Sequence, residues 1–221
     1  MSLNQVDLRT KYNHRFERQF NIESWCTAEL YWRKLKDYDT GKVNKCTIYV
    51  SDDWGDKEYY YTDWSDSKCM NVPFNFDKYF ASDNYGKKKM QLDAIHDGMI
   101  KIAEKEGWDI NPLLDSYNKC LEDKLEYKFY IGKPKSSPNR KYKFTFWCNW
   151  DIDIFEVYWV LQDNKGKEIR REKFIEKEPY LGEFIYYIKF KWKDNESVLL
   201  EHNYKYGNKE KWEIDLSEHT K

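Results

Sequence analysis

The stretch FTFWCNWDIDIFEVYWVLQD, residues 144–163, predicts the architecture of the C-terminal part of the chain. Its apolar side chains fall on even positions from Phe144 to Trp150, and then on odd positions from Phe155 to Leu161. Side chains of a strand alternate between two faces, so each run predicts a strand with one core face. The change of parity favours a hairpin turn within 149–153.

The sequence after this hairpin continues as strands. A turn is predicted at 163–166, followed by an edge-like strand in KEIRREKFIEK (167–177). GEFIYYIKFKWKD (182–194) alternates apolar and polar residues most regularly, and ESVLLEH (196–202) and KWEIDL (211–216) follow it. Because the connections are short, the region 126–216 is predicted to be an antiparallel meander.

The middle of the chain has helical periodicity. In KKKMQLDAIHDGMIKIAEKEG (87–107), apolar residues recur every three or four positions, and Gly107 is placed to end the helix. A second helix is predicted in NPLLDSYNKCLEDKL (111–125), with Asn111 as N-cap and Pro112 at its first position. Its predicted buried face consists of Leu114, Tyr117, Leu121 and Leu125. The two helices are expected to pack as a pair.

The N-terminal region is predicted to consist mainly of strands. CTIYVSDDWGDKEYYYTDW (46–64) is typical of a hairpin with arms at 47–51 and 58–63. Residues 16–25 and 28–38 are predicted as further strands, the second with a helix as the alternative. The expected architecture is a single α+β domain over 1–221, a mostly antiparallel sheet with a two-helix insertion packed on one face. Its parts are N-terminal strands (14–76), a helical pair (77–125) and a meander (126–216).

Composition excludes several classes of protein. The chain has 221 residues, 19% of them aromatic, a mean hydropathy of −1.00 and a net charge of −1. So many rings argue against disorder, and the charge balance makes a nucleic acid partner unexpected. No apolar run is long enough to cross a membrane. Five cysteines without C-x-x-C spacing predict buried thiols in a cytoplasmic protein, without a metal or other cofactor.

The motifs that could carry catalysis are few. The acidic loops 52–58 and 149–153 could hold a cation, but Asp and Asn are also ordinary turn residues. His96 follows Asp93 at helical spacing, which allows either a carboxylate-oriented base or a simple helix-edge pair. His202 falls on a core face. Phosphate-binding glycine motifs and a Gly-x-Ser-x-Gly elbow are absent from the sequence. No catalytic residue is assigned.

One set of rings is left over by the predicted core. Trp147, Tyr158, Ile185 and Tyr187, together with Leu199, fall on the face of the meander opposite the core. Either the helices or the N-terminal strands cover this face, or it is exposed and binds a ligand. Trp147, Tyr158, Ile185 and Tyr187 are therefore the candidate binding site.

Three functions fit these observations. The first is a soluble, non-enzymatic protein that binds another protein as an adaptor or an inhibitor, a bacterial immunity protein being one form. The second is a carbohydrate or small-ligand module, which predicts that Trp147 and Tyr187 are coplanar and face solvent beside polar side chains. The third is a hydrolase with paired carboxylates, for which Asp151 and Asp153 are the candidates.

Overall fold

The computed structural model describes residues 2–35, 37–55, 57–202 and 210–220. The contacts within the chain cluster into two units, Met1–Tyr127 and Lys128–Lys221. The sequence predicts one domain, but the predicted boundary between the helical pair and the meander lies close to this division. The two units are described separately below.

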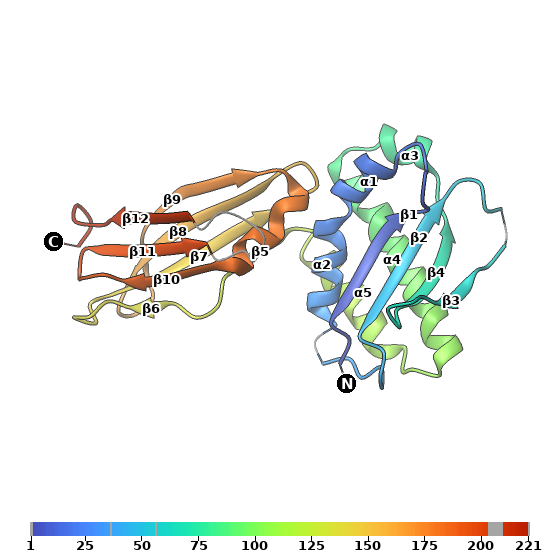
Figure 1. Ribbon diagram of the computed structural model, residues 1–221, viewed down its shortest axis with the longest axis horizontal. Coiled ribbons are helices and arrows are strands. Elements are labelled where there is room, and N and C mark those ends of the chain that lie inside the picture. The colour runs from blue at the N-terminus through green and yellow to red at the C-terminus, as the bar shows by residue number, and fades with distance from the viewer. Residues whose placement is uncertain (1, 36, 56, 203–209, 221) are drawn as a thin grey trace. The chain divides into compact units, whose positions relative to one another are not determined.

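The N-terminal unit is built on a four-stranded sheet (Figure 1). Its strands are β1 (Gln5–Thr10), β2 (Lys45–Ser51), β3 (Tyr60–Thr62) and β4 (Lys68–Pro73). Its helices are α1 (Glu17–Glu23), α2 (Trp25–Lys34), α3 (Phe76–Ala81), α4 (Asn84–Glu106) and α5 (Asn111–Glu122). The strand order is β1-β2-β4-β3, with β1, β2 and β4 parallel and β3 antiparallel to β4.

Helices cover one face of this sheet. Helices α2 and α4 contact each other as well as strands of the sheet, and α5 packs on both helices. The core lies between sheet and helices, where Leu8, Ile48 and Met70 from three strands are buried. Fully buried apolar side chains of this kind contribute roughly 1.5–3 kcal/mol each to stability.

The parallel strands correct the predicted N-terminal hairpin. β2 pairs with β1 and β4, and the second predicted arm is β3, which pairs with β4 instead. The predicted strands at 16–25 and 28–38 are largely the helices α1 and α2. Aromatic residues favour strands in general, but here the buried positions recur with helical period, at Phe20, Ser24, Ala28, Tyr31 and Leu35.

The helical pair is confirmed as α4 and α5. Gly107 ends α4 in a left-handed conformation, with φ of 70°. Asn111 is the first residue of α5 and not its cap, which is Ile110. The buried face of α5 consists of Leu113, Ser116 and Cys120, whereas Leu114 is exposed. The predicted face was therefore rotated by about one residue.

The C-terminal unit contains two antiparallel sheets. The first has the order β5 (Tyr127–Tyr130), β7 (Tyr142–Trp150), β8 (Phe155–Asp163) and β9 (Glu168–Lys177), with β6 (Lys135–Ser136) paired to β7. The second comprises β10 (Ile188–Trp192), β11 (Ser197–His202) and β12 (Glu210–Asp215), and the 3₁₀ helix η1 spans Pro179–Tyr187. The sheets are packed through rings, since Phe190 lies 5.3 Å from Phe144 and 5.4 Å from Phe146 between ring centroids.

The predicted hairpin at 144–163 is confirmed. Trp150 is paired with Phe155 across the turn, and β7 and β8 form one continuous antiparallel ladder. The even-numbered rings of β7 from Phe144 to Trp150 are buried, so most of the aromatic residues in this stretch belong to the core. The strand predicted at 182–194 begins only at Ile188, because η1 precedes it. Pro179, which cannot donate to a ladder, opens that helix.

The α+β fold class with mostly antiparallel pairing is confirmed, and the helices pack on one face of the N-terminal sheet. All five cysteines are buried as expected, and burial raises the pKa of both the Cys46 and Cys120 thiols to about 12. Among the described residues, every helix is too short or too polar to cross a membrane.

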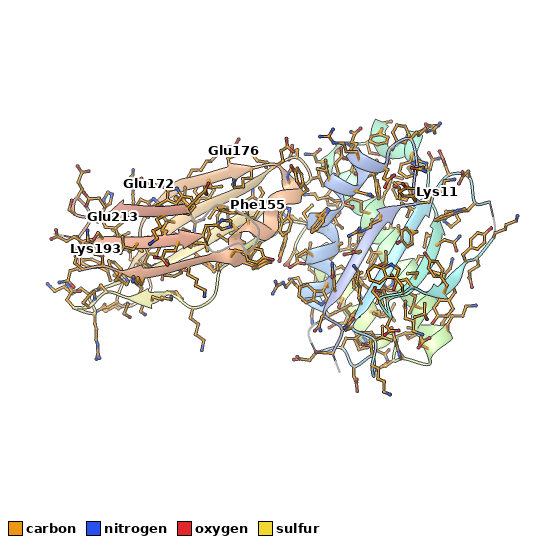
Figure 2. All side chains as sticks on the ribbon, in the orientation of Figure 1. Lys11, Phe155, Glu172, Glu176, Lys193 and Glu213 are labelled. Atoms are coloured by element: carbon orange, nitrogen blue, oxygen red, sulfur yellow. The ribbon has the colours of Figure 1, made fainter. Side chains whose placement is uncertain are left out.

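On the second C-terminal sheet, Lys193 and Glu213 form an ion pair at 2.8 Å (Figure 2).

Candidate functional site

Trp147 and Tyr158, two of the four candidate residues, lie side by side on one sheet. They are directly opposite each other in the ladder between β7 and β8. Their ring centroids are 5.4 Å apart with an interplanar angle of 68°, an edge-to-face contact. Both side chains are half-buried, on the face opposite the core. Such pairs stabilise a sheet and fix the orientation of both rings.

Charged side chains from β9 surround this ring pair. The guanidinium carbon of Arg171 lies 4.4 Å from the Trp147 ring centroid, and Lys173 Nζ lies 5.9 Å from that of Tyr158. Lys173 also pairs with Glu156 at 2.6 Å, and hydrogen bonds to Glu156 and Glu176 raise its pKa. We call this surface the C-terminal aromatic face, and it consists of Trp147, Glu156, Tyr158, Arg171 and Lys173.

The other two candidate residues lie elsewhere in the unit. Ile185 belongs to η1 and is fully buried, so it is a core residue. Tyr187 ends η1, is 37% exposed and lies 6.3 Å from His202 between ring centroids. The alternation that placed both on one face with Trp147 assumed a strand, whereas this segment is helical. Trp147 and Tyr187 therefore do not share the solvent-facing strand face that the carbohydrate hypothesis requires.

The acidic loop 149–153 acts as a turn, whereas Asp52 and Asp53 of the loop 52–58 bind basic side chains. The Ile152 amide donates to Asp151 Oδ1 at 2.8 Å, and the Asp151 amide donates to the Ile154 carbonyl at 2.8 Å. These bonds close the β7–β8 hairpin, as expected of Asp in a turn. Within the described residues, three or more His, Cys, Asp or Glu side chains do not converge anywhere in a way that could hold a metal ion.

A second candidate site lies where the parallel strands of the N-terminal unit end. A cleft of about 540 Å³ opens there, at the edge where ligands of parallel sheets often bind. Its lining residues are Ser51, Asp52, Gly55, Pro73, Phe74, Asn75, Phe76 and Asp77. Lys11, which follows β1, forms an ion pair with Asp53 beside it (Figure 2). The missed strand β1 hid this edge from sequence reasoning.

His14 beside this cleft is engaged at both ring nitrogens. Its Nδ1 accepts a hydrogen bond from the Phe16 amide at 3.2 Å, so the proton sits on Nε2, which faces Asp52 Oδ1 at 3.1 Å. Arg15 binds the other oxygen of Asp52 at 2.8 Å, and the hydrogen bond from His14 helps to lower the pKa of Asp52. The arrangement ties the loop after β1 to the loop after β2 and leaves neither ring nitrogen for a substrate proton.

His96 is placed differently from the predicted Asp93–His96 pair. The Asp93 carboxylate binds Lys89 and the Tyr117 hydroxyl, each within 2.7 Å. His96 Nδ1 instead faces the Tyr31 hydroxyl at 3.3 Å, and its ring lies 4.5 Å from that of Tyr117. The imidazole therefore fills the junction of α2, α4 and α5.

Burial of His96 predicts a pH-dependent stability. Desolvation lowers its pKa, against the opposing influence of Asp93 and Asp97. Below the ordinary pKa of about 6.5, the unfolded chain binds a proton that the folded chain does not. Stability is therefore expected to fall as pH drops from about 6.5 towards the lowered pKa. Urea unfolding at pH 7 and pH 5 should show a smaller loss in His96→Gln than in the wild type. His202, whose pKa is also lowered, contributes equally to the loss of stability in both proteins, so any difference between them comes from His96. Equal losses in the wild type and in His96→Gln would therefore contradict this assignment.

Comparisons with known proteins do not extend these observations: no family model, curated protein or solved structure matches the chain.

Proposed function

We propose that this chain is a non-enzymatic protein that binds another protein, as an adaptor or an inhibitor does, through its C-terminal aromatic face. The observation that supports this proposal is the half-exposed, edge-to-face pair of Trp147 and Tyr158 with Arg171 stacked on the indole. Trp, Tyr and Arg are the residue types that most often dominate the binding energy of protein interfaces.

The side chains of this face are held in place before any partner arrives. Lys173 binds two carboxylates, and Glu156 accepts hydrogen bonds from Asn149 at 3.0 Å and from Tyr158 at 3.2 Å. Side chains that are already ordered lose less entropy on association. The resulting surface has an apolar centre and a rim of paired charges, the usual plan of a specific protein interface.

Stacked Arg171 also argues for a protein partner over a sugar. A carbohydrate ring stacks on an open aromatic face, but one face of Trp147 already carries the guanidinium at 4.4 Å. Arg171 Nε and Nη2 donate to the Glu168 carboxylate at 3.1 and 2.8 Å, and the guanidinium offers its remaining N–H groups to carboxylates or carbonyls of a partner. The surface thus favours recognition of polar protein groups around a small apolar contact.

The test is affinity capture from a lysate of the organism that produces the protein, followed by binding measurements with the purified captured protein. The double variant Trp147→Ala/Tyr158→Ala is expected to bind that partner at least about tenfold more weakly than the wild type, as hot-spot residues do. Both side chains are half-exposed, so the unit should remain folded, which circular dichroism and thermal unfolding verify.

A matched control is Tyr12→Ala, which removes an aromatic side chain that is 81% exposed in the other unit. It should bind like the wild type. Equal binding by wild type and double variant would show that the partner uses another surface. If neither captures a protein, the proposal fails and small-molecule ligands become the alternative.

A further inference from the structure

Strand β9 forms one border of the first C-terminal sheet (Figure 1). It spans ten residues, Glu168–Lys177, and among the residues that the structure describes it pairs with β8 alone. The backbone groups along the free side of a border strand can add a further strand to the sheet. Arg171 and Lys173 of the C-terminal aromatic face belong to β9, so this free edge adjoins the proposed binding surface.

The hydrogen bonds of β8 identify which backbone groups of β9 point inward. Backbone groups of successive residues in an antiparallel strand point alternately to its two neighbours. Asp163, the last residue of β8, donates its amide to the Lys167 carbonyl at 2.9 Å, so the odd-numbered residues of β8 bond towards β9. Trp159 therefore exchanges its backbone bonds with Glu172, which is its partner in the register.

The residues on either side of Glu172 point the other way. The backbone groups of Arg171 and Lys173 face the free edge, and they bond no other backbone or side chain within the described residues. Two N–H and two C=O groups are thus presented in a row. Another extended chain satisfies such a row, because its own donors and acceptors recur with the same spacing.

Two irregularities in β9 limit the length of this free segment. The register with β8 skips Ile169 at one end and Phe174 at the other, and residues 170–173 form a regular ladder between them. Bulges of this kind twist an edge away from continued pairing. The added strand is therefore expected to be short and centred on Arg171 and Lys173.

The charges of this segment argue against a second copy of the chain as the added strand. Two copies of β9 that pair about a two-fold axis through the outward groups would place Arg171 opposite Arg171, Lys173 opposite Lys173, or one opposite the other. Like charges directly opposite each other destabilise a pair of strands. The occupant that fits this edge is therefore an extended segment of a different protein.

We propose that the partner protein adds an extended segment to β9 as a further strand, hydrogen bonded to the backbone of Arg171 and Lys173. This inference rests on the proposed function and specifies how the partner binds. Every second side chain of the added strand then lies on the same side of the sheet as Trp147 and Tyr158. In complexes of this type the backbone bonds provide affinity and the alternate side chains provide specificity.

The first measurement is amide hydrogen exchange, followed residue by residue with nuclear magnetic resonance on the full chain alone. The amides of Arg170 and Glu172 should exchange slowly because they bond β8, whereas those of Arg171 and Lys173 should exchange rapidly. Slow exchange at Arg171 and Lys173 in the free protein would overturn the proposal, because this edge would already be occupied.

The second measurement uses a phage-displayed library of random peptides, selected on the full chain and counter-selected on Lys173→Pro. Proline is tolerated on a border strand where the missing N–H faces outward, so this variant should fold with one donor fewer. A synthetic copy of a selected peptide should slow exchange of the Arg171 and Lys173 amides in the wild type. It should bind Lys173→Pro at least about tenfold more weakly than Lys173→Ala, which loses the side chain but keeps the amide.

The variant Trp147→Ala/Tyr158→Ala separates this inference from the proposed function. Peptides that bind Lys173→Pro and Lys173→Ala equally, but bind the double variant weakly, would overturn strand addition and leave the aromatic face as the binding surface. Peptides that need the Lys173 amide but bind the double variant like the wild type would support strand addition and count against the aromatic face. The absence of selected peptides would overturn the proposal. Sedimentation that shows a dimer dissociated by Lys173→Pro would also overturn it, since the added strand would then come from a second copy.

Discussion

Trp150→Ala is expected to lower the free energy of unfolding of the C-terminal unit by about 3–5 kcal/mol, the usual cost of removing a large aromatic side chain from a core. Trp150 is 2% exposed and lies 5.3 Å from Phe155 between ring centroids, in an edge-to-face contact across the β7–β8 hairpin. The backbone of η1 also runs against the indole, since a Cβ on Gly182 would lie 2.3 Å from Trp150 Cε2. Loss of the ring therefore leaves a cavity between hairpin and helix.

Hydrogen exchange followed by mass spectrometry suits this measurement, because the chain has two units and a single unfolding transition is not assured. Peptides from β7, β8 and η1 should lose protection, while peptides from α4 and β2 keep theirs. Trp64→Ala is the matched control, because it removes the same side chain from a position that is 98% exposed. It should change stability by less than about 0.5 kcal/mol. Similar losses in both variants would contradict a core role for Trp150.

The sequence predicted best where periodicity and turn chemistry agreed. The β7–β8 hairpin has alternating rings on both arms and Asp residues at its turn, and α4 has an apolar stripe ended by Gly107. In both cases local preference and tertiary packing favour the same structure. The strands predicted at 16–25 and 28–38 are wrong, and the helix alternative for 28–38 is right, because Phe20, Tyr31 and Leu35 lie at helical spacing.

Parallel pairing was the feature least accessible from sequence. β1 and β2 are separated by two helices, and no turn motif marks two strands that pair over such a distance. Two consequences for the candidate sites followed. The cleft at the carboxyl ends of β1, β2 and β4 does not follow from the sequence, and the tyrosines of β2 and β3 are predicted on two paired arms of a hairpin, whereas β4 lies between these strands.

Two of the four candidate binding residues lie where the sequence predicts them. Trp147 and Tyr158 were placed correctly because β7 and β8 are regular strands in register. Ile185 is buried and not on the outer face, because η1 gives its segment a helical course. Tyr187 is exposed as expected, but it belongs to η1 and not to a strand. Arg171, which stacks on Trp147, could not have been found, since register shifts along β9 decide which of its charged side chains reach the rings.

Gly98→Ala is expected to destabilise the N-terminal unit by about 1–3 kcal/mol, although alanine is the better helix former by about 1 kcal/mol. Gly98 lies in the middle of α4, where a Cβ atom would stand 2.6 Å from Ile48 Cδ1 and 2.7 Å from its Cγ2. Ile48 is fully buried on the central strand β2, and β-branched side chains are stiff. Gly98 has no side chain and therefore lets α4 approach the sheet closely.

A double-mutant cycle with Ile48→Ala separates the clash from other effects, because this substitution removes every Ile48 atom that a new Cβ would meet. In the Ile48→Ala background, Gly98→Ala should be neutral or stabilising, since only its helix preference remains. Hydrogen exchange of α4 and β2 peptides gives the four stabilities. If Gly98→Ala costs the same in both backgrounds, close helix–sheet packing is not the reason for glycine at this position. A sign reversal between the backgrounds would show that contact with Ile48 is what requires glycine at this position of α4.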